Sequence, residues 1–326
     1  MKDTNGTFSV KEFVLLGFPS LNHLQALLFL VFCLIYVITL IENLVIIIIV
    51  QANRHLHTPM YFFLANLSVL EALYTSVTIP KMLDNFLNDK KTISFSGCFT
   101  QLFFFLSLAS SECFLLAAMA YDRYLAICLP LRYPALMNPT LCVGLALSAW
   151  LSGFLASFVS IVLISQLSFC GPNVLNHFFC DISPVLKLSC SNTEAIETLD
   201  FVAALAVLMT SLSVTAFSYI CILATVIRIP SGTGRRKAFS TCASHLVVVI
   251  VFYTTTIFMY ARPRAISTFD FNKLVSIIYS VVTPLINPII YCLRNREVWE
   301  ALAKLTRISR LSVATHFSSS KRGKFI

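Results

Sequence analysis

The sequence predicts an all-α membrane protein, a bundle of seven transmembrane helices, and two observations carry this prediction. Of the 326 residues, 57% are hydrophobic and only 12% are charged, about half the charged share of a soluble domain. Seven runs of mostly apolar residues also occur, each reaching the roughly 20 residues that a helix needs to cross a bilayer. A soluble chain could not bury this much apolar surface, so soluble protein classes are excluded.

The seven runs are separated by charged or turn-rich segments. They span residues 24–50, 59–79, 99–129, 141–163, 196–227, 238–260 and 274–292. The second and seventh are the weakest because each contains proline and polar residues, so hydropathy alone leaves the count uncertain by one. These boundaries predict an N-terminal tail over residues 1–23, a seven-helix bundle over 24–292 and a C-terminal tail over 293–326.

The basic residues predict the orientation of the bundle. With seven helices, the two termini lie on opposite sides of the membrane. If the N-terminus is extracellular, 15 of the 24 Lys and Arg residues fall on the cytoplasmic side, as the positive-inside rule requires. The net charge of +9 then favours anionic lipids or an acidic partner protein, and not nucleic acid. In this orientation Asn5, in an Asn-Gly-Thr triplet, is a glycosylation acceptor in the extracellular tail.

Four of the 11 cysteines fall on the outer side in this topology. Cys98 begins the third helix, whereas Cys170, Cys180 and Cys190 share one long loop. An oxidising compartment favours disulfides, and four cysteines allow three pairings. We therefore expect at least one bridge between this loop and the top of the third helix.

Carboxyls lie inside the predicted helices at Glu42, Glu71 and Glu112, and the amides Asn43 and Asn287 accompany them. A charge at the centre of a membrane helix costs roughly 2.5–3.5 kcal/mol on insertion scales. If these side chains lie at one depth, they form a buried polar site for a sodium ion, a proton or waters. Protonated carboxyls that only bond to neighbouring helices are the structural alternative, and a transporter or channel would also use such carboxyls.

Three segments carry polar motifs near the predicted cytoplasmic ends of helices. Residues 119–128 read MAYDRYLAIC, with Asp122 beside Arg123 where the third helix ends. Release of the arginine from this pair would be a two-state charge switch, although a solvated ion pair has the same spacing. Residues 235–245, RRKAFSTCASH, open the sixth helix. Residues 284–291, PLINPIIY, contain two prolines that permit a bend in the seventh.

Together with LHTPMYFFL at residues 56–64 and Ser218-Tyr219 in the fifth helix, these motifs resemble those of the rhodopsin-like G-protein-coupled receptors, and more narrowly the olfactory (odorant) receptors. The resemblance covers nearly the whole chain. The three-cysteine loop resembles that of the larger tetrapod class of these receptors (class II). Two positions depart from the common pattern, because Glu42 replaces a glycine and Glu71 replaces an aspartate, which keeps the carboxyl.

The resemblance implies a plasma-membrane receptor that binds small volatile odorants in the outer half of the bundle. It also implies activation of a stimulatory olfactory G protein, which raises cyclic AMP. The implied disulfides are Cys98–Cys180 and Cys170–Cys190. The implied switch and coupling residues are Asp122, Arg123, Tyr124, Tyr219, Lys237, Asn287, Pro288 and Tyr291. The buried polar site would comprise Asn43, Glu71 and Glu112, with a sodium ion or proton at Glu71 and Glu112 and no other cofactor.

Helical spacing within the implied outer half predicts a ligand pocket that is mostly apolar with a few hydroxyls. The predicted lining residues are Phe105, Leu106, Ala109, Ser110, Ala203, Val207, Thr210, Tyr253, Thr256 and Tyr260. No unpaired charge is expected at the level where an amine ligand would need one, so binding should be hydrophobic with one or two hydrogen bonds. His177, in the segment HFFCD, is a weak candidate for a copper or zinc ligand, because a disulfide would consume Cys180.

After residue 292, apolar residues recur at near-helical spacing among basic ones, which predicts a short amphipathic helix on the membrane surface. These residues are Val298, Trp299, Leu302 and Leu305. Two rival functions stay open: a receptor of the same fold for a metabolite or peptide, and a transporter or channel, although the sequence shows neither an internal repeat nor paired broken helices. An enzyme is not expected, because the sequence lacks a Ser-His-Asp arrangement, a phosphate-cradling loop and a water-facing set of metal ligands.

Overall fold

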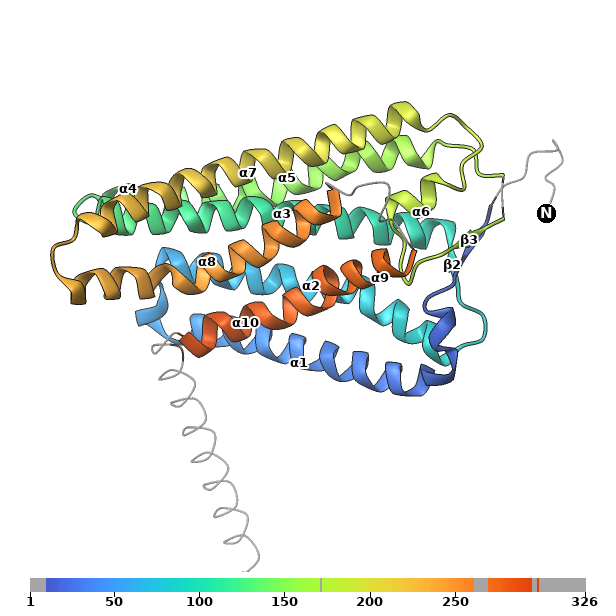
Figure 1. Cartoon of the computed structure of the whole chain (residues 1–326), viewed down its shortest axis with the longest axis horizontal. Coiled ribbons are helices and arrows are strands. Elements are labelled where there is room, and N and C mark those ends of the chain that lie inside the picture. The colour runs from blue at the N-terminus through green and yellow to red at the C-terminus, as the bar shows by residue number, and fades with distance from the viewer. Residues whose placement is uncertain (1–9, 171, 261–268, 295–297, 299–326) are drawn as a thin grey trace, which may run out of the picture.

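The computed structural model describes residues 10–170, 172–260, 269–294 and 298, without the side chains of some helical residues. Long helices run side by side along one axis, and a small sheet lies at one end (Figure 1). The long elements are α1 (Gln25–Ala52), α2 (Pro59–Leu87), α3 (Phe95–Cys128), α5 (Pro139–Ser165), α7 (Glu194–Arg228) and α8 (Gly232–Tyr260), followed by a last helix formed by α9 (Phe269–Ile277), η4 (Ile278–Val282) and α10 (Thr283–Arg294). Short elements are η1 (Pro19–Leu24), η2 (Arg54–Leu56), α4 (Tyr133–Leu136) and α6 (Ile182–Leu186).

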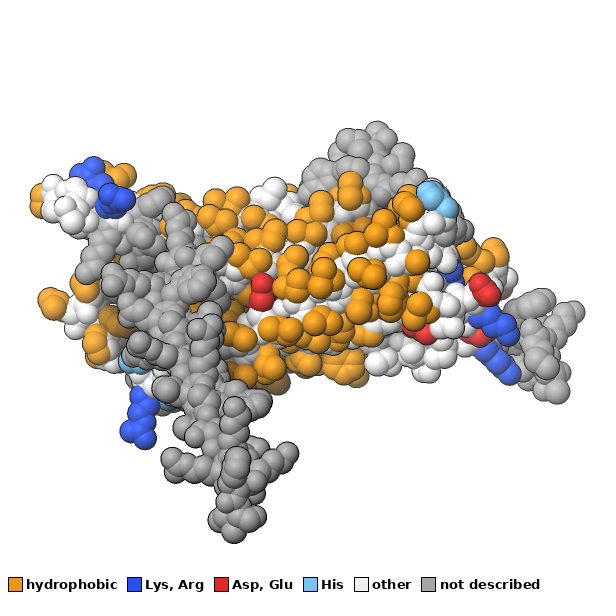
Figure 2. All heavy atoms as spheres, turned by 90° about the horizontal axis from the view of Figure 1, so that it is seen from below, with side chains coloured by type: hydrophobic (Ala, Val, Ile, Leu, Met, Phe, Trp, Pro, Cys, Tyr) orange, Lys and Arg blue, Asp and Glu red, His pale blue; other side chains and the backbone are white. Residues whose placement is uncertain are grey.

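The length and composition of these helices confirm the predicted seven-helix membrane fold. In the described residues, six helices are long and apolar enough to cross a membrane, and α8 adds a shorter apolar stretch over His245–Ile257. Large apolar side chains point outward, and Leu30, Leu155 and Ile220 are 65%, 67% and 65% exposed. Figure 2 shows a face that is mostly hydrophobic along the bundle, with Lys and Arg gathered at its two ends. The chain is a multi-pass membrane protein whose outward side chains face lipid.

Most predicted helix boundaries agree with the structure to within a few residues, but three do not. The second predicted run stops at residue 79, whereas α2 continues through Pro80 to Leu87. A membrane helix tolerates an internal proline because neighbouring groups satisfy the freed backbone carbonyl. α8 begins at Gly232, ahead of the predicted 238, and the last helix begins at Phe269 and contains the π-helical turn η4.

α3 is the central helix of the bundle, and its buried residues extend along its whole length. The chain enters this helix through Ser94, whose hydroxyl accepts a hydrogen bond from the Gly97 amide at 3.1 Å. α5 packs unusually closely against α3 at Gly153. A Cβ built at this glycine would lie 2.6 Å from the Ser107 carbonyl oxygen and 2.6 Å from the Ser111 amide nitrogen. Only glycine permits this approach of the two backbones.

A three-stranded sheet marks one end of the bundle, which we call the sheet end; the opposite end is the Arg123 end. The central strand β1 (Glu12–Leu15) pairs antiparallel with β2 (Thr92–Ser94) and parallel with β3 (Val174–Leu175). Phe13 of β1 is fully buried against the rings of Phe95 and Phe169. The predicted tail over residues 1–23 therefore contains a strand that is part of the fold.

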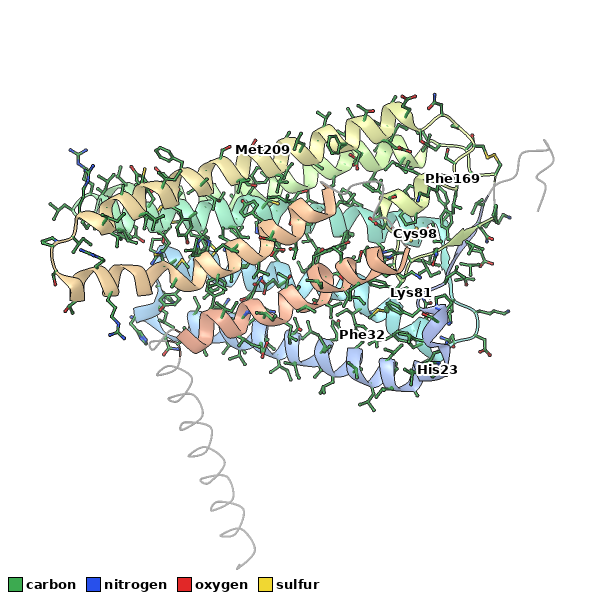
Figure 3. The ribbon with its side chains drawn as sticks, in the orientation of Figure 1. His23, Phe32, Lys81, Cys98, Phe169 and Met209 are labelled. Carbon is green, nitrogen blue, oxygen red and sulfur yellow. A yellow bond between two sulfur atoms is a disulfide. The ribbon has the colours of Figure 1, made fainter. Side chains whose placement is uncertain are left out.

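Two disulfides fasten the loop between α5 and α7. They join Cys98 to Cys180 and Cys170 to Cys190, the same pairs that the family resemblance implies. Figure 3 shows Cys98 and Phe169 at the sheet end, with Met209 on α7 farther along the bundle. Because Phe179 and Cys180 are fully buried, the loop packs into the sheet end and does not extend away from it.

Candidate functional site

A cavity of about 420 Å³ lies inside the bundle toward the sheet end. Residues of α2, α3, α5, α7, α8 and the last helix form its walls, and the loop contributes Asp181, Ile182 and Ser183. Its apolar surface includes Phe105, Val207 and Phe252. Pockets for small ligands span about 300–1,000 Å³ and are mostly apolar with a few polar groups. The cavity therefore fits a small, largely hydrophobic molecule.

Most of the predicted pocket residues line this cavity: Phe105, Leu106, Ala109, Ser110, Ala203, Val207 and Thr256. Two do not, and the structure corrects them. Thr210 lies on the exposed face of α7. Tyr253 is buried, and its hydroxyl lies 3.4 Å from the Thr215 hydroxyl, so it joins α8 to α7. Spacing gives the period of a helix but not its rotation against its neighbours, which packing sets. The side chain of Tyr260 lies outside the described residues.

Three carboxyls line the cavity as well, those of Glu112, Asp181 and Asp200. The prediction of no unpaired charge where an amine ligand would need one therefore overlooked these acidic groups. The Asp200 carboxyl forms a hydrogen bond with the hydroxyl of Ser160 on α5. Asp181 caps α6 by accepting a hydrogen bond from the Ile182 amide at 2.9 Å. The sequence could have indicated Asp200 as a site residue, because an acid inside the predicted run 196–227 is unusual. It could not have indicated Asp181, because the position of a loop residue depends on how the chain folds.

A buried polar cluster joins four helices deeper in the bundle. The Asn287 side-chain amide of α10 donates to Glu71 Oε1 of α2 at 2.6 Å. Asn43 of α1 hydrogen-bonds to the same carboxyl, and Glu112 of α3 is near enough to interact with it electrostatically. All four side chains are at most 4% exposed. The structure thus brings together Asn43, Glu71 and Glu112, the predicted buried polar residues, whereas Glu42 is only partly buried.

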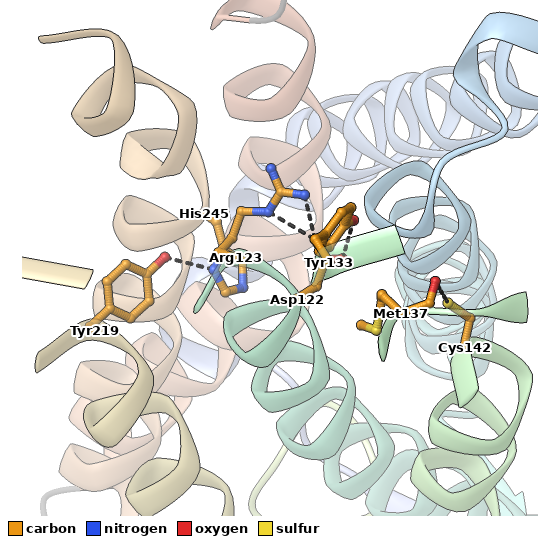
Figure 4. A network of polar contacts seen from close by, with 7 residues as sticks. All are labelled: Asp122, Arg123, Tyr133, Met137, Cys142, Tyr219 and His245. Carbon is orange, nitrogen blue, oxygen red and sulfur yellow. Dashed lines mark hydrogen bonds and ion pairs between the residues drawn. The ribbon is translucent and has the colours of Figure 1, made fainter. Parts of the chain in front are cut away.

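At the Arg123 end, Asp122 and Arg123 form an ion pair, with Arg123 Nε 2.9 Å from Asp122 Oδ2. The hydroxyl of Tyr133 in α4 donates to Asp122 Oδ1 at 2.7 Å (Figure 4). Partial burial and the neighbouring Asp122 carboxylate raise the pKa of Tyr133, so its hydroxyl stays protonated and can donate at neutral pH. Asp122 itself is fully buried, so its two oxygens are held by Arg123 and Tyr133.

A second polar pair lies beside Arg123 (Figure 4). The Tyr219 hydroxyl of α7 is 2.7 Å from Nδ1 of His245 of α8, and both side chains are buried. Tyr291 of α10 is also buried, and no described residue hydrogen-bonds to its hydroxyl. The sequence named Tyr219 and Tyr291 but gave no role to His245 or Tyr133.

The other predicted coupling residues occupy a range of positions. The Tyr124 ring packs against the rings of Tyr121 and Phe217. Pro288 lies inside α10. The side chain of Lys237, the glycosylation candidate Asn5 and, apart from Val298, the predicted amphipathic helix lie outside the described residues.

The weak metal candidate His177 is engaged by protein groups. Its Nε2 lies 3.2 Å from the Ser276 hydroxyl, and its Nδ1 lies 3.4 Å from the Phe179 amide, which donates to it. Cys180 is consumed by a disulfide. Nowhere in the part of the chain that the structure describes do three His, Cys, Asp or Glu side chains gather as metal ligands. The segment therefore fastens the loop to the last helix.

Comparison with known proteins identifies the family. Residues 32–308 match the model of the olfactory receptor family. Olfactory receptor 6B9 of Mus musculus is 59% identical over 296 residues, which cover 91% of this chain and 94% of that protein. Olfactory receptor 226 of Rattus norvegicus is 54% identical, covering 99% and 100% of the two chains. Olfactory receptor 6B1 of Homo sapiens is 57% identical, covering 91% and 94%.

These relatives are named as receptors and not as enzymes. This agrees with the prediction that the chain is not an enzyme. The seven-helix bundle, the cavity between its helices and the matches over most of the chain agree with one another. The chain therefore belongs to the olfactory receptor family.

Proposed function

We propose that this chain is an odorant receptor that binds small, mostly apolar volatile molecules in the cavity near the sheet end. Binding activates a stimulatory olfactory G protein at the Arg123 end, which raises cyclic AMP. The observation that carries the proposal is the cavity of about 420 Å³, whose walls include Phe252 and Thr256 of α8, the helix that also holds His245. One helix, α8, thus connects the ligand site with the Tyr219–His245 pair beside Arg123.

The coupling follows from the contacts of α8. Tyr253 of this helix bonds to Thr215 of α7, and His245, about two turns away, bonds to Tyr219 of α7. A ligand that presses on Phe252 and Thr256 favours a state in which α8 moves away from α7 and these two contacts break. Arg123 is then released from Asp122 toward the G protein. The ligand stabilises this state only by the difference in its affinity for the two arrangements.

In this proposal the sheet end is extracellular and the Arg123 end is cytoplasmic, in the plasma membrane. The predicted topology assigns 15 of the 24 Lys and Arg residues to the cytoplasmic side, which supports this orientation. The same charge favours the anionic lipids of the cytoplasmic leaflet.

We also propose that the buried polar cluster holds a sodium ion or a proton between Glu71 and Glu112. The residues present fit such a group. The Asn43 side-chain oxygen is buried and has no hydrogen-bond partner in the described residues, and oxygen ligands suit hard cations. When bound, the cation would neutralise the buried carboxyls and stabilise the resting arrangement of α2, α3 and α10.

A steric test of the cavity uses two alanines of α7. Ala204 lines the cavity, whereas Ala206 is exposed on the opposite face of the same helix. Ala204→Phe places a ring in the cavity, so the half-maximal odorant concentration should rise at least about tenfold, as a loss of roughly 1.4 kcal/mol predicts. Ala206→Phe should leave it unchanged. The measurement is cyclic AMP in cells that display an N-terminal epitope tag on their intact surface.

This tag also tests the orientation, because it stains intact cells only if the N-terminus is extracellular. Equal responses of the two variants would contradict the cavity as the ligand site. A response that persists in cells without the stimulatory G protein, or an odorant-gated current that does, would favour a channel and contradict the receptor mechanism.

A further inference from the structure

We infer that the cavity selects protonated amines that carry an apolar tail over acids and neutral odorants of the same carbon skeleton. This inference rests on the proposed function, because it names the ligand class of the same cavity. The described wall contains the carboxyls of Glu112, Asp181 and Asp200 and no Lys, Arg or His side chain. In a cavity between helices, where the dielectric is lower than in water, such a set attracts a cation and repels a carboxylate.

Asp200 is the anchor for the ammonium group. It lies on α7 about one turn or two from the apolar lining residues Ala203 and Val207, and the Ser160 hydroxyl of α5 lies beside its carboxyl. An ammonium has three donors, so it can bond to the carboxylate and to the serine oxygen together. Charge-assisted hydrogen bonds of this kind are stronger than neutral ones.

Glu112 is the independent sign that the cavity accommodates a donor or a cation. Its side chain is only 4% exposed, yet it forms part of the cavity wall. Within the described part of the chain, no hydrogen bond reaches its carboxyl, and the nearby polar group is a second carboxyl, that of Glu71. A buried carboxyl without a donor is costly. A ligand cation in the cavity reduces this cost, whereas a ligand carboxylate increases it.

Apolar side chains of the same cavity predict that the rest of the ligand is hydrocarbon. Phe105 and Leu106 of α3 and Phe252 of α8 line the same cavity. The ligand therefore has two specific features, a charged head group near Asp200 and a hydrocarbon body that packs along these apolar side chains. Arg262 and Arg264 belong to residues 261–268, outside the described part of the chain, so the experiment includes acids as a direct test of the opposite preference.

The experiment compares a straight-chain amine, alcohol, aldehyde and carboxylic acid of equal carbon number on the full-length receptor, by cyclic AMP and surface staining. The amine should have the lowest half-maximal concentration. Asp200→Asn should raise that concentration about tenfold or more for the amine, as loss of a charged hydrogen bond predicts, and should change the alcohol little. Glu197→Gln is the matched control, since Glu197 is exposed on the same helix and does not line the cavity.

Asp200→Glu, which keeps the charge, should restore the amine response relative to Asp200→Asn. If Asp200→Asn fails to reach the surface, the ranking of the four compounds on the native receptor decides. An acid or alcohol that is more potent than the amine overturns the inference and leaves the proposed function intact. An equal loss for amine and alcohol in Asp200→Asn overturns the assigned ion pair. No response to any compound at normal surface display contradicts the proposed function itself, and the inference with it.

Discussion

The contact between Tyr133 and Asp122 extends the ion pair of Arg123 beyond its own helix. Asp122 is fully buried, and a buried carboxylate needs every available donor. Arg123 supplies donors from the same helix, and Tyr133 supplies one from α4 at 2.7 Å. The hydroxyl thereby stabilises the arrangement in which Asp122 is ionised and holds Arg123.

Tyr133→Phe removes only this hydroxyl, so it should weaken the resting arrangement. A hydrogen bond to a charged group contributes about 1.5–3 kcal/mol, which predicts a rise in ligand-independent cyclic AMP of about tenfold or more. Tyr36→Phe is the matched control, because its hydroxyl bonds to Ser76 at 3.0 Å in another part of the bundle. Unchanged basal signalling in Tyr133→Phe, with normal surface display, would show that the contact does not restrain Arg123.

Two residues that the sequence wrongly assigned to the cavity wall lie on the correct helices, but they point in a different direction about the helix axis from their correctly assigned neighbours. Val207 lines the cavity, but Thr210, three positions later, faces outward. Tyr253 turns toward Thr215 even though Phe252 and Thr256, on either side of it, line the cavity. Successive residues of a helix point about 100° apart. Which of them faces the cavity therefore depends on how the helix is rotated, and packing against neighbouring helices sets that rotation.

At the scale of elements, the contact between α3 and α5 depends on one glycine. A Cβ at Gly153 would lie 2.2 Å from the Ser111 hydroxyl and 2.6 Å from two backbone atoms of α3. The side chain of Ser111 can rotate, but the backbone of a central helix cannot yield without moving its other contacts. The spacing of these two helices is therefore fixed by the absence of a side chain.

Gly153→Ala should destabilise the receptor by about 1–3 kcal/mol, the usual cost of overpacking. Gly144→Ala is its control on the same helix, since a Cβ there meets nothing within 4 Å. That substitution should leave stability unchanged or raise it by up to about 1 kcal/mol, because alanine favours helix. The measurement is the melting temperature of the detergent-solubilised receptor. Equal melting temperatures for the two variants would mean that α3 and α5 separate without cost.

At the scale of the whole molecule, the Glu71–Asn287 bond connects the first half of the chain with the last helix across a sequence separation of 216 residues. Asn43 and Glu112 complete this contact from α1 and α3. A change of charge at Glu71 should therefore be felt at both ends of the bundle, because the helices that carry it extend from the ligand cavity to the Arg123 end.

Glu71→Gln keeps an acceptor for Asn287 but removes the charge. If the cluster binds sodium, replacing sodium by choline in the medium should raise basal cyclic AMP in the native receptor and not in Glu71→Gln. If it binds a proton instead, the dependence of basal activity on pH should disappear in the variant. Glu197→Gln, at an exposed carboxyl of α7 outside the cluster, should behave as the native receptor. The proposal fails if neither sodium nor pH affects the native receptor differently from Glu71→Gln.

The sequence by itself determined the seven-helix membrane fold and the family, because long apolar runs and short motifs are local properties of the chain. It also indicated Asp122, Arg123, Glu71 and Asn287 as polar residues where polarity is costly. Only the tertiary structure decided that β1 joins a sheet and that Asp181 and Asp200 enter the cavity. These features arise from contacts between distant segments and from the rotation of packed helices. Local hydropathy and residue spacing determine neither the contacts nor the rotation.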